Sequence, residues 1–427
     1  MNHYDAGIVK EILQQEGFQP VSNENEADII LLITCSVRAH AEARALGRLA
    51  SLKRKSNGNR VVGILGCMAQ NYQRRLIDEF GADLVVGPDG YRQLPSLLKA
   101  CLTAENKLAV GGRRPVVGGF LKECYEGILP KPEPKAVRGF VSIMRGCDNF
   151  CSYCIVPYVR GRERSRDYKD IIKEIEFLAK SGVKDITLIG QNVLAYHSGG
   201  LDFGGLLKEV EKISGIEWIR FVTAHPKDFS EPVIETLANL KKFCPCLHLP
   251  LQSGSNRILA LMRRHYTKEE FLKKIKLTRA LIPEVSFTTD LMVGFPTETD
   301  EDFSETLTMV EEIRFDFAYM FQYSPRPQTA ALKIKPEVDP KVAHSRLEQL
   351  IKVQSRITKE NTERLIGKEF LAMVEGSKGS QTLARTKTNK IVVLDNGKPQ
   401  AEGEIIKVKI IGVRGWTLVG EEKKEAK

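Results

Sequence analysis

The chain of 427 residues lacks any long hydrophobic run. A membrane-spanning helix needs about 20 consecutive apolar residues, whereas the longest apolar stretch near the N-terminus, residues 29–33, has only the length of a β-strand. Residues 1–25 are polar and amphipathic, unlike a secretory signal peptide. The sequence therefore argues against a helical membrane protein and predicts a cytoplasmic location.

A second C-x2-C pair, which would complete a typical four-cysteine zinc site, is also absent. The chain nevertheless contains nine cysteines, more than core packing requires. In a reducing compartment, such cysteines are better explained as metal ligands or catalytic thiols than as disulfides.

Acidic residues are fewer than basic ones. The chain has 64 Lys and Arg against 54 Asp and Glu, so its formal net charge is +10. This balance suits a polyanionic partner such as RNA. A merely basic, soluble enzyme explains the net charge equally well.

Four segments differ in their patterns and together predict an α/β protein. Residues 1–102 alternate apolar strands with amphipathic helices, as in a parallel-sheet α/β domain. Residues 103–132 lack periodicity and are rich in Gly and Pro, which predicts a linker. Residues 133–364 contain six strand-like runs separated by helices, which predicts a partial (β/α)6 barrel. Residues 365–427 have short strands and Gly-rich turns, typical of a small antiparallel β-barrel.

The individual elements expected in the first domain are three helices and three strands. The helices are at 8–16, 41–55 and 72–80, and the strands at 28–34, 60–65 and 83–86. The six barrel strands are expected at 139–144, 185–189, 218–223, 246–251, 285–294 and 317–323, and a long helix at 340–363.

Cys147, Cys151 and Cys154 have the spacing C-x3-C-x2-C in the loop after the first barrel strand. Three thiolates this close can bind three corners of a [4Fe–4S] cube and leave one iron open. S-adenosylmethionine (SAM) chelates such an iron. The alternative is a structural zinc site with a distant fourth ligand such as Cys124 or His225, and the spacing favours the radical-SAM interpretation.

Cys35 and Cys67 both follow predicted strands of the N-terminal sheet. Open α/β sheets place their ligands at the C-terminal strand ends. As metal ligands these two thiols need at least one further partner. Two buried core cysteines are the simpler alternative.

The chain resembles the radical-SAM methylthiotransferases over essentially its whole length, most closely the MiaB type. The matching stretches are Thr34-Cys-Ser-Val-Arg38, Gly66-Cys-Met-Ala-Gln70, the run Arg145-Gly-Cys-Asp-Asn-Phe-Cys-Ser-Tyr-Cys-Ile-Val-Pro-Tyr-Val-Arg-Gly161, Leu188-Ile-Gly-Gln-Asn-Val193, Leu247-His-Leu-Pro-Leu-Gln-Ser-Gly-Ser-Asn256, Thr288-Thr-Asp-Leu-Met-Val-Gly-Phe-Pro296 and Tyr323-Ser-Pro-Arg-Pro327. The resemblance implies an N-terminal methylthiotransferase domain, a radical-SAM core and a C-terminal TRAM domain that binds tRNA.

The resemblance also implies metal ligands. Cys147, Cys151 and Cys154 are expected to bind the radical-SAM cluster, and Cys35 and Cys67 a second, auxiliary [4Fe–4S] cluster that supplies or carries the inserted sulfur. The family uses three cysteines there. The third would lie two residues upstream of Met1, together with the first strand of the sheet.

Two explanations compete for this departure from the family. Either the natural start lies upstream and the chain is truncated at an internal methionine, which we favour, or the protein has two auxiliary ligands. Cys101 and Cys124 are poorer substitutes. We therefore expect this chain to hold its auxiliary cluster weakly and to cleave SAM without completing methylthiolation.

Polar residues at the predicted strand ends fit a SAM pocket, because the ribose, amino and carboxylate groups of SAM need donors and acceptors on a rigid scaffold. Each can equally be a packing residue. The candidate cofactor-binding residues are Tyr153, Gln191, Asn192, Ser253 and Asp290.

Arginines alternate directly after the cysteine loop and could contact RNA phosphates or the SAM carboxylate. A solvated basic loop is the alternative. The candidate RNA-binding residues are Arg160, Arg162 and Arg164 here and Arg385, Lys387 and Arg414 in the C-terminal barrel.

The resemblance implies that a methylthio group is added to C2 of N6-isopentenyladenosine at tRNA position 37, where a radical is needed to activate the C–H bond. The alternatives are methylthiolation of threonylcarbamoyl-adenosine or of a ribosomal-protein aspartate, or a non-catalytic, zinc-stabilised RNA-binding protein. Expected partners are the tRNA anticodon loop and a reductant such as flavodoxin, with the protein as a monomer.

Overall fold

The computed structural model describes residues 1–56, 60–103, 116–119, 122–395 and 400–423. The chain divides into two compact units. The first unit comprises residues 1–131, 142–170 and 324–329, and the second comprises residues 132–141, 171–323 and 330–427. The cysteine loop after residue 146 thus belongs to the same unit as the N-terminal sheet. Much of the predicted linker, at 104–115 and 120–121, lies outside the described residues.

The first unit contains a four-stranded sheet in the order β1-β2-β3-β4, with every neighbouring pair parallel. The strands are β1 (Ile29–Thr34), β2 (Val61–Gly66), β3 (Leu84–Val86) and β4 (Val116–Val117). The main helices are α1 (Asn2–Gln15), α2 (Ala39–Ser56), α3 (Cys67–Tyr72), α4 (Arg75–Asp78) and α5 (Leu94–Thr103). The parallel α/β prediction is confirmed.

One predicted helix is wrong. The segment 72–80 does not form one helix, because Gln73 has a φ of +46° and separates α3 from α4. Helix α1 also begins six residues earlier than predicted, since Tyr4 and Asp5 are buried and hold its first turn in the unit.

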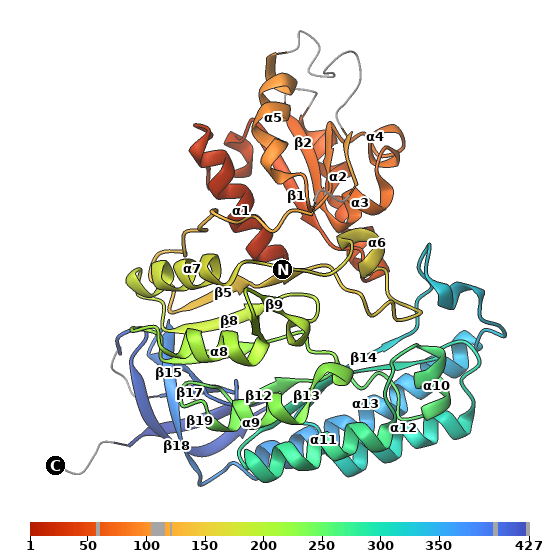
Figure 1. Cartoon of the computed structure of the whole chain (residues 1–427), viewed down its shortest axis with the longest axis vertical. Helices are drawn as coiled ribbons and strands as arrows, with labels where there is room; N and C mark the ends of the chain where they lie inside the picture. The colour runs from red at the N-terminus through yellow and green to blue at the C-terminus, as the bar shows by residue number, and fades with distance from the viewer. Residues whose placement is uncertain (57–59, 104–115, 120–121, 396–399, 424–427) are drawn as a thin grey trace. The chain divides into compact units, whose positions relative to one another are not determined.

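The strands are apolar along most of their length, because successive side chains face helices on opposite sides of this sheet. Leu49 and Leu52 of α2 and Leu76 of α4 pack with Val62 and Ile64 of β2 in one core cluster. Helices α1 and α5 contact each other and α1 contacts β1 (Figure 1). The sheet is therefore covered by helices on both faces.

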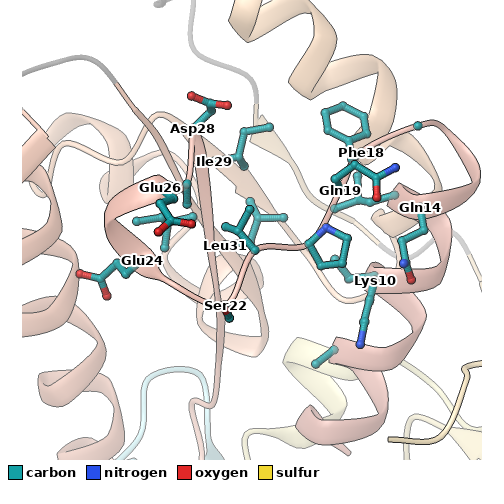
Figure 2. Close-up of a pocket in the computed structure, with 18 of the residues that line it drawn as sticks. Lys10, Gln14, Phe18, Gln19, Ser22, Glu24, Glu26, Asp28, Ile29 and Leu31 are labelled. Carbon is teal, nitrogen blue, oxygen red and sulfur yellow. The ribbon is translucent and has the colours of Figure 1, made fainter. Parts of the chain in front are cut away.

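β1 is an edge strand among the described strands, and a cavity of about 860 Å³ lies beside it. Figure 2 shows Lys10 and Gln14 of α1 on one side of this cavity and Ile29 and Leu31 of β1 on the other. Phe18, the polar turn that precedes β1, further residues of α1 and Leu102 of α5 also line it. The cavity is apolar at the strand and polar at the rim.

The second unit contains six strands of the predicted partial barrel. They form two three-stranded sheets, β11-β8-β5 and β12-β13-β14, and Ile219 of β11 forms an isolated parallel bridge with Phe243, on the segment that leads into β12. The strands are β5 (Arg138–Ser142), β8 (Asp185–Ile189), β11 (Trp218–Phe221), β12 (Cys246–His248), β13 (Ser286–Val293) and β14 (Phe317–Gln322). The main intervening helices are α7 (Tyr168–Lys180), α8 (Phe203–Glu211), α9 (Glu231–Asn239), α10 (Asn256–Leu261), α11 (Lys268–Leu281) and α12 (Asp300–Ile313). The strands follow chain order and do not close.

The C-terminal segment forms a closed barrel in the order β15-β16-β17-β19-β18. Its strands are β15 (Glu369–Lys378), β16 (Gln381–Thr386), β17 (Ile391–Leu394), β18 (Ile405–Arg414) and β19 (Thr417–Glu422). The predicted small antiparallel barrel is confirmed, with one parallel pair, β17 and β19, among its antiparallel neighbours. The barrel closes because β17 pairs with β19 rather than with β18, the next strand in the chain.

Buried contacts dock this small barrel on the partial barrel within the second unit. Met373 packs with Val137, Trp218 and Cys244. Arg220 is paired with Asp185 at 2.9 Å and donates hydrogen bonds to the carbonyls of Thr386, at the end of β16, and of Lys387.

The long helix α13 (Pro340–Glu363) precedes this barrel and has the predicted bounds. Within the described residues, no helix combines the length and hydrophobicity that crossing a bilayer would require.

Candidate functional site

The loop that carries Cys147, Cys151 and Cys154 is closed by backbone contacts. β6 (Met144–Arg145) pairs antiparallel with β7 (Arg164–Ser165) across its base. The amide of Cys147 donates to the carbonyl of Gly161 at 3.2 Å. Gly146 has a φ of +76°, and a Cβ there would lie 2.0 Å from the Arg162 carbonyl oxygen. A glycine is therefore required where the loop begins.

The three thiols of this loop fit an iron–sulfur cluster by their chemistry. Cys151 is buried, and Cys147 and Cys154 are half-buried. Burial raises the pKa of Cys147 to about 11, so the free thiol is protonated at neutral pH and metal binding has to displace its proton. No three His, Cys, Asp or Glu side chains in the described ranges converge on one metal ion. A cubane cluster does not demand this, because each of its thiolates binds a different iron.

Cys35 and Cys67 come from neighbouring strand ends. Thr34 of β1 is paired with Gly66 of β2, and each cysteine is the next residue. Gly66 has a φ of +87°, and a Cβ there would lie 2.9 Å from the Thr34 carbonyl oxygen, so a side chain would push the two strand ends apart. The structure thus brings together the two thiols that the sequence places 32 residues apart.

These two thiols differ in their surroundings. Cys67 is buried and packs against Ile155 and Val159, which directly follow the three-cysteine loop. Cys35 is half-buried and accepts a hydrogen bond from the amide of Val37 at 3.4 Å. Burial raises the pKa of the Cys35 thiol.

A buried charge network surrounds Cys67. The carboxylate of Asp5 is fully buried and accepts hydrogen bonds from Arg145 at 2.6 Å and Arg160 at 2.7 Å. Arg160 also donates its Nε to Sγ of Cys67 at 3.1 Å. Arg145 lies over the ring of Tyr125, 4.7 Å from its centroid. Burial disfavours ionisation of Asp5, but the two guanidinium groups outweigh it and lower the pKa of this carboxyl.

A second buried arginine holds the Cys35 loop. Arg326, on the segment that follows β14, donates to Glu42 at 2.8 Å and to the Val37 carbonyl at 3.1 Å. Glu42 also accepts a hydrogen bond from Ser36 at 2.7 Å. The two residues that follow Cys35, Ser36 and Val37, are therefore anchored by the Arg326–Glu42 ion pair.

The sequence-predicted cofactor residues have different environments. Asn192 is buried, accepts a hydrogen bond from the His225 amide at 3.0 Å and donates to Asp228 at 2.7 Å. Ser253 is fully buried, with its Oγ 3.4 Å from Oγ1 of Thr306. Asn192 thus joins two loops, and Ser253 joins its loop to α12, within the second unit.

The remaining three candidates, Tyr153, Gln191 and Asp290, are half-buried. Of these, Asp290 lies 3.4 Å from Nε2 of His248.

His248, Asp290 and Tyr319 lie on one face of neighbouring strands. His248 is in register with Thr288, and Asp290 with Tyr319, so these side chains point to the same side of the sheet. The Tyr319 ring is edge-on to His248 at 5.8 Å and to Phe317 at 5.1 Å. Tyr319 is 50% exposed and Phe317 41% exposed. This face offers aromatic surface beside a polar pair.

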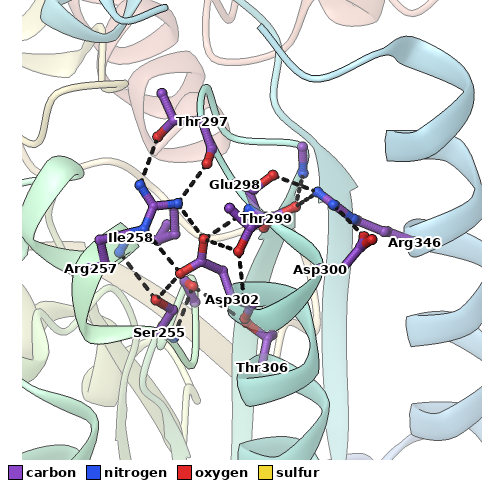
Figure 3. A network of polar contacts seen from close by, with 12 residues as sticks. Ser255, Arg257, Ile258, Thr297, Glu298, Thr299, Asp300, Asp302, Thr306 and Arg346 are labelled. Atoms are coloured by element: carbon purple, nitrogen blue, oxygen red, sulfur yellow. Dashed lines mark hydrogen bonds and ion pairs between the residues drawn. The ribbon is translucent and has the colours of Figure 1, made fainter. Parts of the chain in front are cut away.

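Charged networks fix the loops at the ends of β12 and β13 (Figure 3). Asp302 accepts hydrogen bonds from Ser255 at 2.6 Å and from the Thr299 amide at 2.8 Å, and it forms an ion pair with Arg257. Burial opposes the ionisation of Asp302, but these hydrogen bonds outweigh it and lower its pKa to about 2. Arg346 of α13 binds Glu298 at 2.9 Å on the loop after β13.

Three family models match consecutive parts of the chain. The Radical SAM superfamily matches residues 141–310, the uncharacterized protein family UPF0004 matches residues 1–87, and the TRAM domain matches residues 363–422. The three matches together span both cysteine groups and the C-terminal barrel.

Relatives match over nearly the full length. The tRNA-2-methylthio-N(6)-dimethylallyladenosine synthase of Thermoanaerobacter sp. (strain X514) is 41% identical over 99% of this chain and 90% of that protein. The protein of the same name from Parabacteroides distasonis is 42% identical over 100% of this chain and 94% of that protein. The chain belongs to the radical-SAM methylthiotransferase family.

Among solved structures, the radical S-adenosylmethionine methyltransferase TsrM from Kitasatospora setae has a TM-score of 0.57. It is 14% identical and covers 77% of this chain and 74% of that chain, so this likeness concerns the fold alone.

In this methylthiotransferase, the arginines after the cysteine loop are largely engaged within the protein. The side chain of Arg160 is 3% exposed and that of Arg164 is 13% exposed, the latter paired with Asp89. Arg162 is 74% exposed and pairs with Asp148 at 3.0 Å. Of the three, Arg162 presents the accessible cation.

In the TRAM barrel of the methylthiotransferase, Arg385 is paired with Glu375 at 2.9 Å and Lys387 donates to the Lys241 carbonyl. Arg414 is 70% exposed at the β18–β19 turn. The neighbouring Trp416 is 56% exposed. Of the predicted residues in this barrel, Arg414 is the most accessible to RNA.

Sequence reasoning missed the residues that support the thiols. Asp5 and Arg326 act across long chain separations and carry no local signal. His248 and Tyr319 could have been found, because alternation along their strands places them on the same face as Asp290.

Proposed function

We propose that this methylthiotransferase adds a methylthio group to C2 of N6-isopentenyladenosine at position 37 of tRNA. The observation that carries the proposal is that one compact unit contains two sets of cysteines. The first set is Cys147, Cys151 and Cys154 on a loop, and the second is Cys35 and Cys67 at adjacent strand ends. The name that the relatives carry supports this substrate and does not favour the threonylcarbamoyl-adenosine, ribosomal-aspartate or zinc-protein alternatives.

Cys147, Cys151 and Cys154 would hold a [4Fe–4S] cluster with one open iron for SAM, and Cys35 and Cys67 would bind the auxiliary cluster. When bound, the cluster and SAM supply the radical chemistry that an unactivated C–H bond requires. The chain's own residues keep the thiols in place. Gly146 closes the loop, and Arg160 and Arg326 anchor the two strand-end cysteines.

The exposed face of the partial barrel would bind a nucleoside. Asp290 and His248 offer a carboxylate and an imidazole for polar contacts, and Tyr319 and Phe317 offer rings for a planar adenine and its apolar substituent. The charged networks around Asp302 and Glu298 hold the adjoining loops, so little ordering is needed on binding. Gln191 and Tyr153 remain predictions for SAM.

The TRAM barrel would bind the tRNA backbone. Arg414 supplies an exposed guanidinium for phosphate, and Trp416 supplies an adjacent ring for an unstacked base. Arg162 would add a contact near the cysteine loop. A flavodoxin-type reductant and a monomeric state remain predictions.

The test uses anaerobically reconstituted protein, SAM, dithionite and tRNA that contains N6-isopentenyladenosine, with nucleoside mass spectrometry as the readout. Because the two-cysteine auxiliary site is expected to hold its cluster weakly, we expect the parent chain to convert only a small fraction of this tRNA to the methylthiolated nucleoside, and Cys151→Ala to convert none. Cys101→Ala is the matched control, because Cys101 is a buried thiol of the same unit outside both groups. Equal product from the Cys151→Ala variant, or modification of only threonylcarbamoyl-adenosine, would refute the proposal.

A further inference from the structure

Arg160 is a buried arginine in direct contact with a cysteine. It ends α6 (Val156–Arg160), six residues after Cys154. Its Nε donates to Sγ of Cys67 at 3.1 Å, and its Nη2 donates to Oδ2 of Asp5 at 2.7 Å. A guanidinium is rarely buried without acceptors that carry charge. One of the two acceptors used here is sulfur.

The third nitrogen of this guanidinium lacks an acceptor. Nη1 of Arg160 is buried and has no hydrogen-bond partner within the described part of the chain. The carboxylate of Asp5 cannot supply one easily, because Arg145 already binds its other oxygen at 2.6 Å. Buried donors without partners are uncommon in folded proteins, so this position favours an additional anionic acceptor.

Arg160 also lies on the segment that links the three-cysteine loop to Cys67. Ile155 and Val159, on the same segment, pack against Cys67. The segment begins directly after Cys154 and ends at the arginine that contacts Cys67. The cysteine loop and Cys67 are therefore linked through a short helix.

We propose that Arg160 is the positioning residue of the auxiliary sulfur site. Its Nε holds the Cys67 ligand, and its Nη1 donates to a second anionic sulfur atom, an inorganic sulfide of the bound cluster. Asp5 and α6 keep the guanidinium in place. The inference rests on the proposed function, since it assumes that Cys35 and Cys67 bind iron. Hydrogen bonds to cluster sulfur raise the reduction potential, because they stabilise the more negative, reduced state.

The test isolates the auxiliary site in the full chain by replacing Cys147, Cys151 and Cys154 with alanine. In this background we compare Arg160, Arg160→Gln and Arg160→Lys after anaerobic reconstitution with iron and sulfide. The readouts are iron and sulfide per protein and the reduction potential from EPR-monitored titration. Arg75→Gln is the control, since Arg75 is a solvent-exposed arginine of the same unit paired with Glu79.

We expect the Arg160→Gln variant to retain several-fold less iron and sulfide and to have a more negative potential. Arg160→Lys should lie between it and the parent, and Arg75→Gln should equal the parent. Unchanged iron, sulfide and potential in Arg160→Gln would overturn the proposal. If Arg160→Gln does not fold, Arg160→Lys decides, and an unchanged potential there overturns it as well. A parent background that binds no iron contradicts the auxiliary site itself, which separates failure of the proposed function from failure of the role of Arg160.

Discussion

Cys147, Cys151 and Cys154 lie on one loop that backbone contacts close, whereas Cys35 and Cys67 lie at two strand ends that distant side chains anchor. The loop depends on a β6–β7 pair and on a glycine at position 146. The strand-end pair depends on Arg160 and Arg326, which reach it from segments far along the chain. The first group is thus sensitive to local backbone geometry, and the second to buried charge.

The difference has an energetic consequence. A loop closed by main-chain hydrogen bonds tolerates most side-chain changes. A buried ion pair does not, because removal of one partner leaves an uncompensated charge and costs about 3–5 kcal/mol.

The largest effect is expected for Gly146→Ala, which tests the backbone side of the comparison. The new Cβ would lie 2.0 Å from the Arg162 carbonyl oxygen, so the loop has to open. We expect loss of the loop's iron and of SAM cleavage, measured as iron content and 5′-deoxyadenosine release. Gly127→Ala is the control, since Gly127 also has a positive φ but has open space around it. Equal losses in both variants would mean that the positive φ, and not the contact with the Arg162 carbonyl, causes the effect.

Asp5→Ala tests the buried-charge side. The change leaves the guanidiniums of Arg145 and Arg160 without their shared carboxylate, and we expect the free energy of unfolding of the metal-free first unit to fall by about 3–5 kcal/mol. Urea denaturation measures it. Glu79→Gln, which removes a solvent-exposed ion pair with Arg75, should leave the midpoint unchanged. A shift of the same size in both variants would contradict the comparison.

Arg326→Gln should change the alkylation rate of Cys35 but not that of Cys147. Loss of the Glu42 pair frees the Cys35 loop, so we expect several-fold faster alkylation of Cys35 in metal-free protein, with Cys147 unchanged. Peptide mass spectrometry after timed iodoacetamide treatment gives both rates in one sample. Parallel acceleration of Cys35 and Cys147 would mean that the loop depends on the same anchor.

The smallest effect is expected at acidic pH and extends the comparison to the second unit. The pKa of Asp302 is lowered to about 2 in the folded protein, against about 3.9 in an unfolded chain. Its contribution to stability is therefore complete above about pH 4 and is lost as the pH falls toward 2. In the Asp302→Asn variant, the midpoint of unfolding should therefore fall less steeply between pH 5 and pH 2 than in the parent chain. An unchanged slope would show that other carboxyls dominate the acid transition.

Local patterns predicted a large part of this molecule. The bounds of α13 and the strand set of the partial barrel follow from apolar periodicity, which depends on neighbouring residues only. The helix predicted at 72–80 was wrong because a single positive φ at Gln73 has no signal in apolar periodicity. The parallel pairing of β17 with β19 likewise depends on barrel closure, which no strand specifies alone.

By itself, the sequence determined the spacing of Cys147, Cys151 and Cys154 and the chemistry of three thiols on one loop, because ligands so close in the chain stay close in any fold. Tertiary structure alone decided that Asp5 shares its carboxylate with Arg145 and Arg160, 140 and 155 residues away. It also placed Arg160, which the sequence suggested for RNA, against Cys67. The physical reason is that a buried charge is tolerated only with its partners, and those partners meet only when the chain has folded.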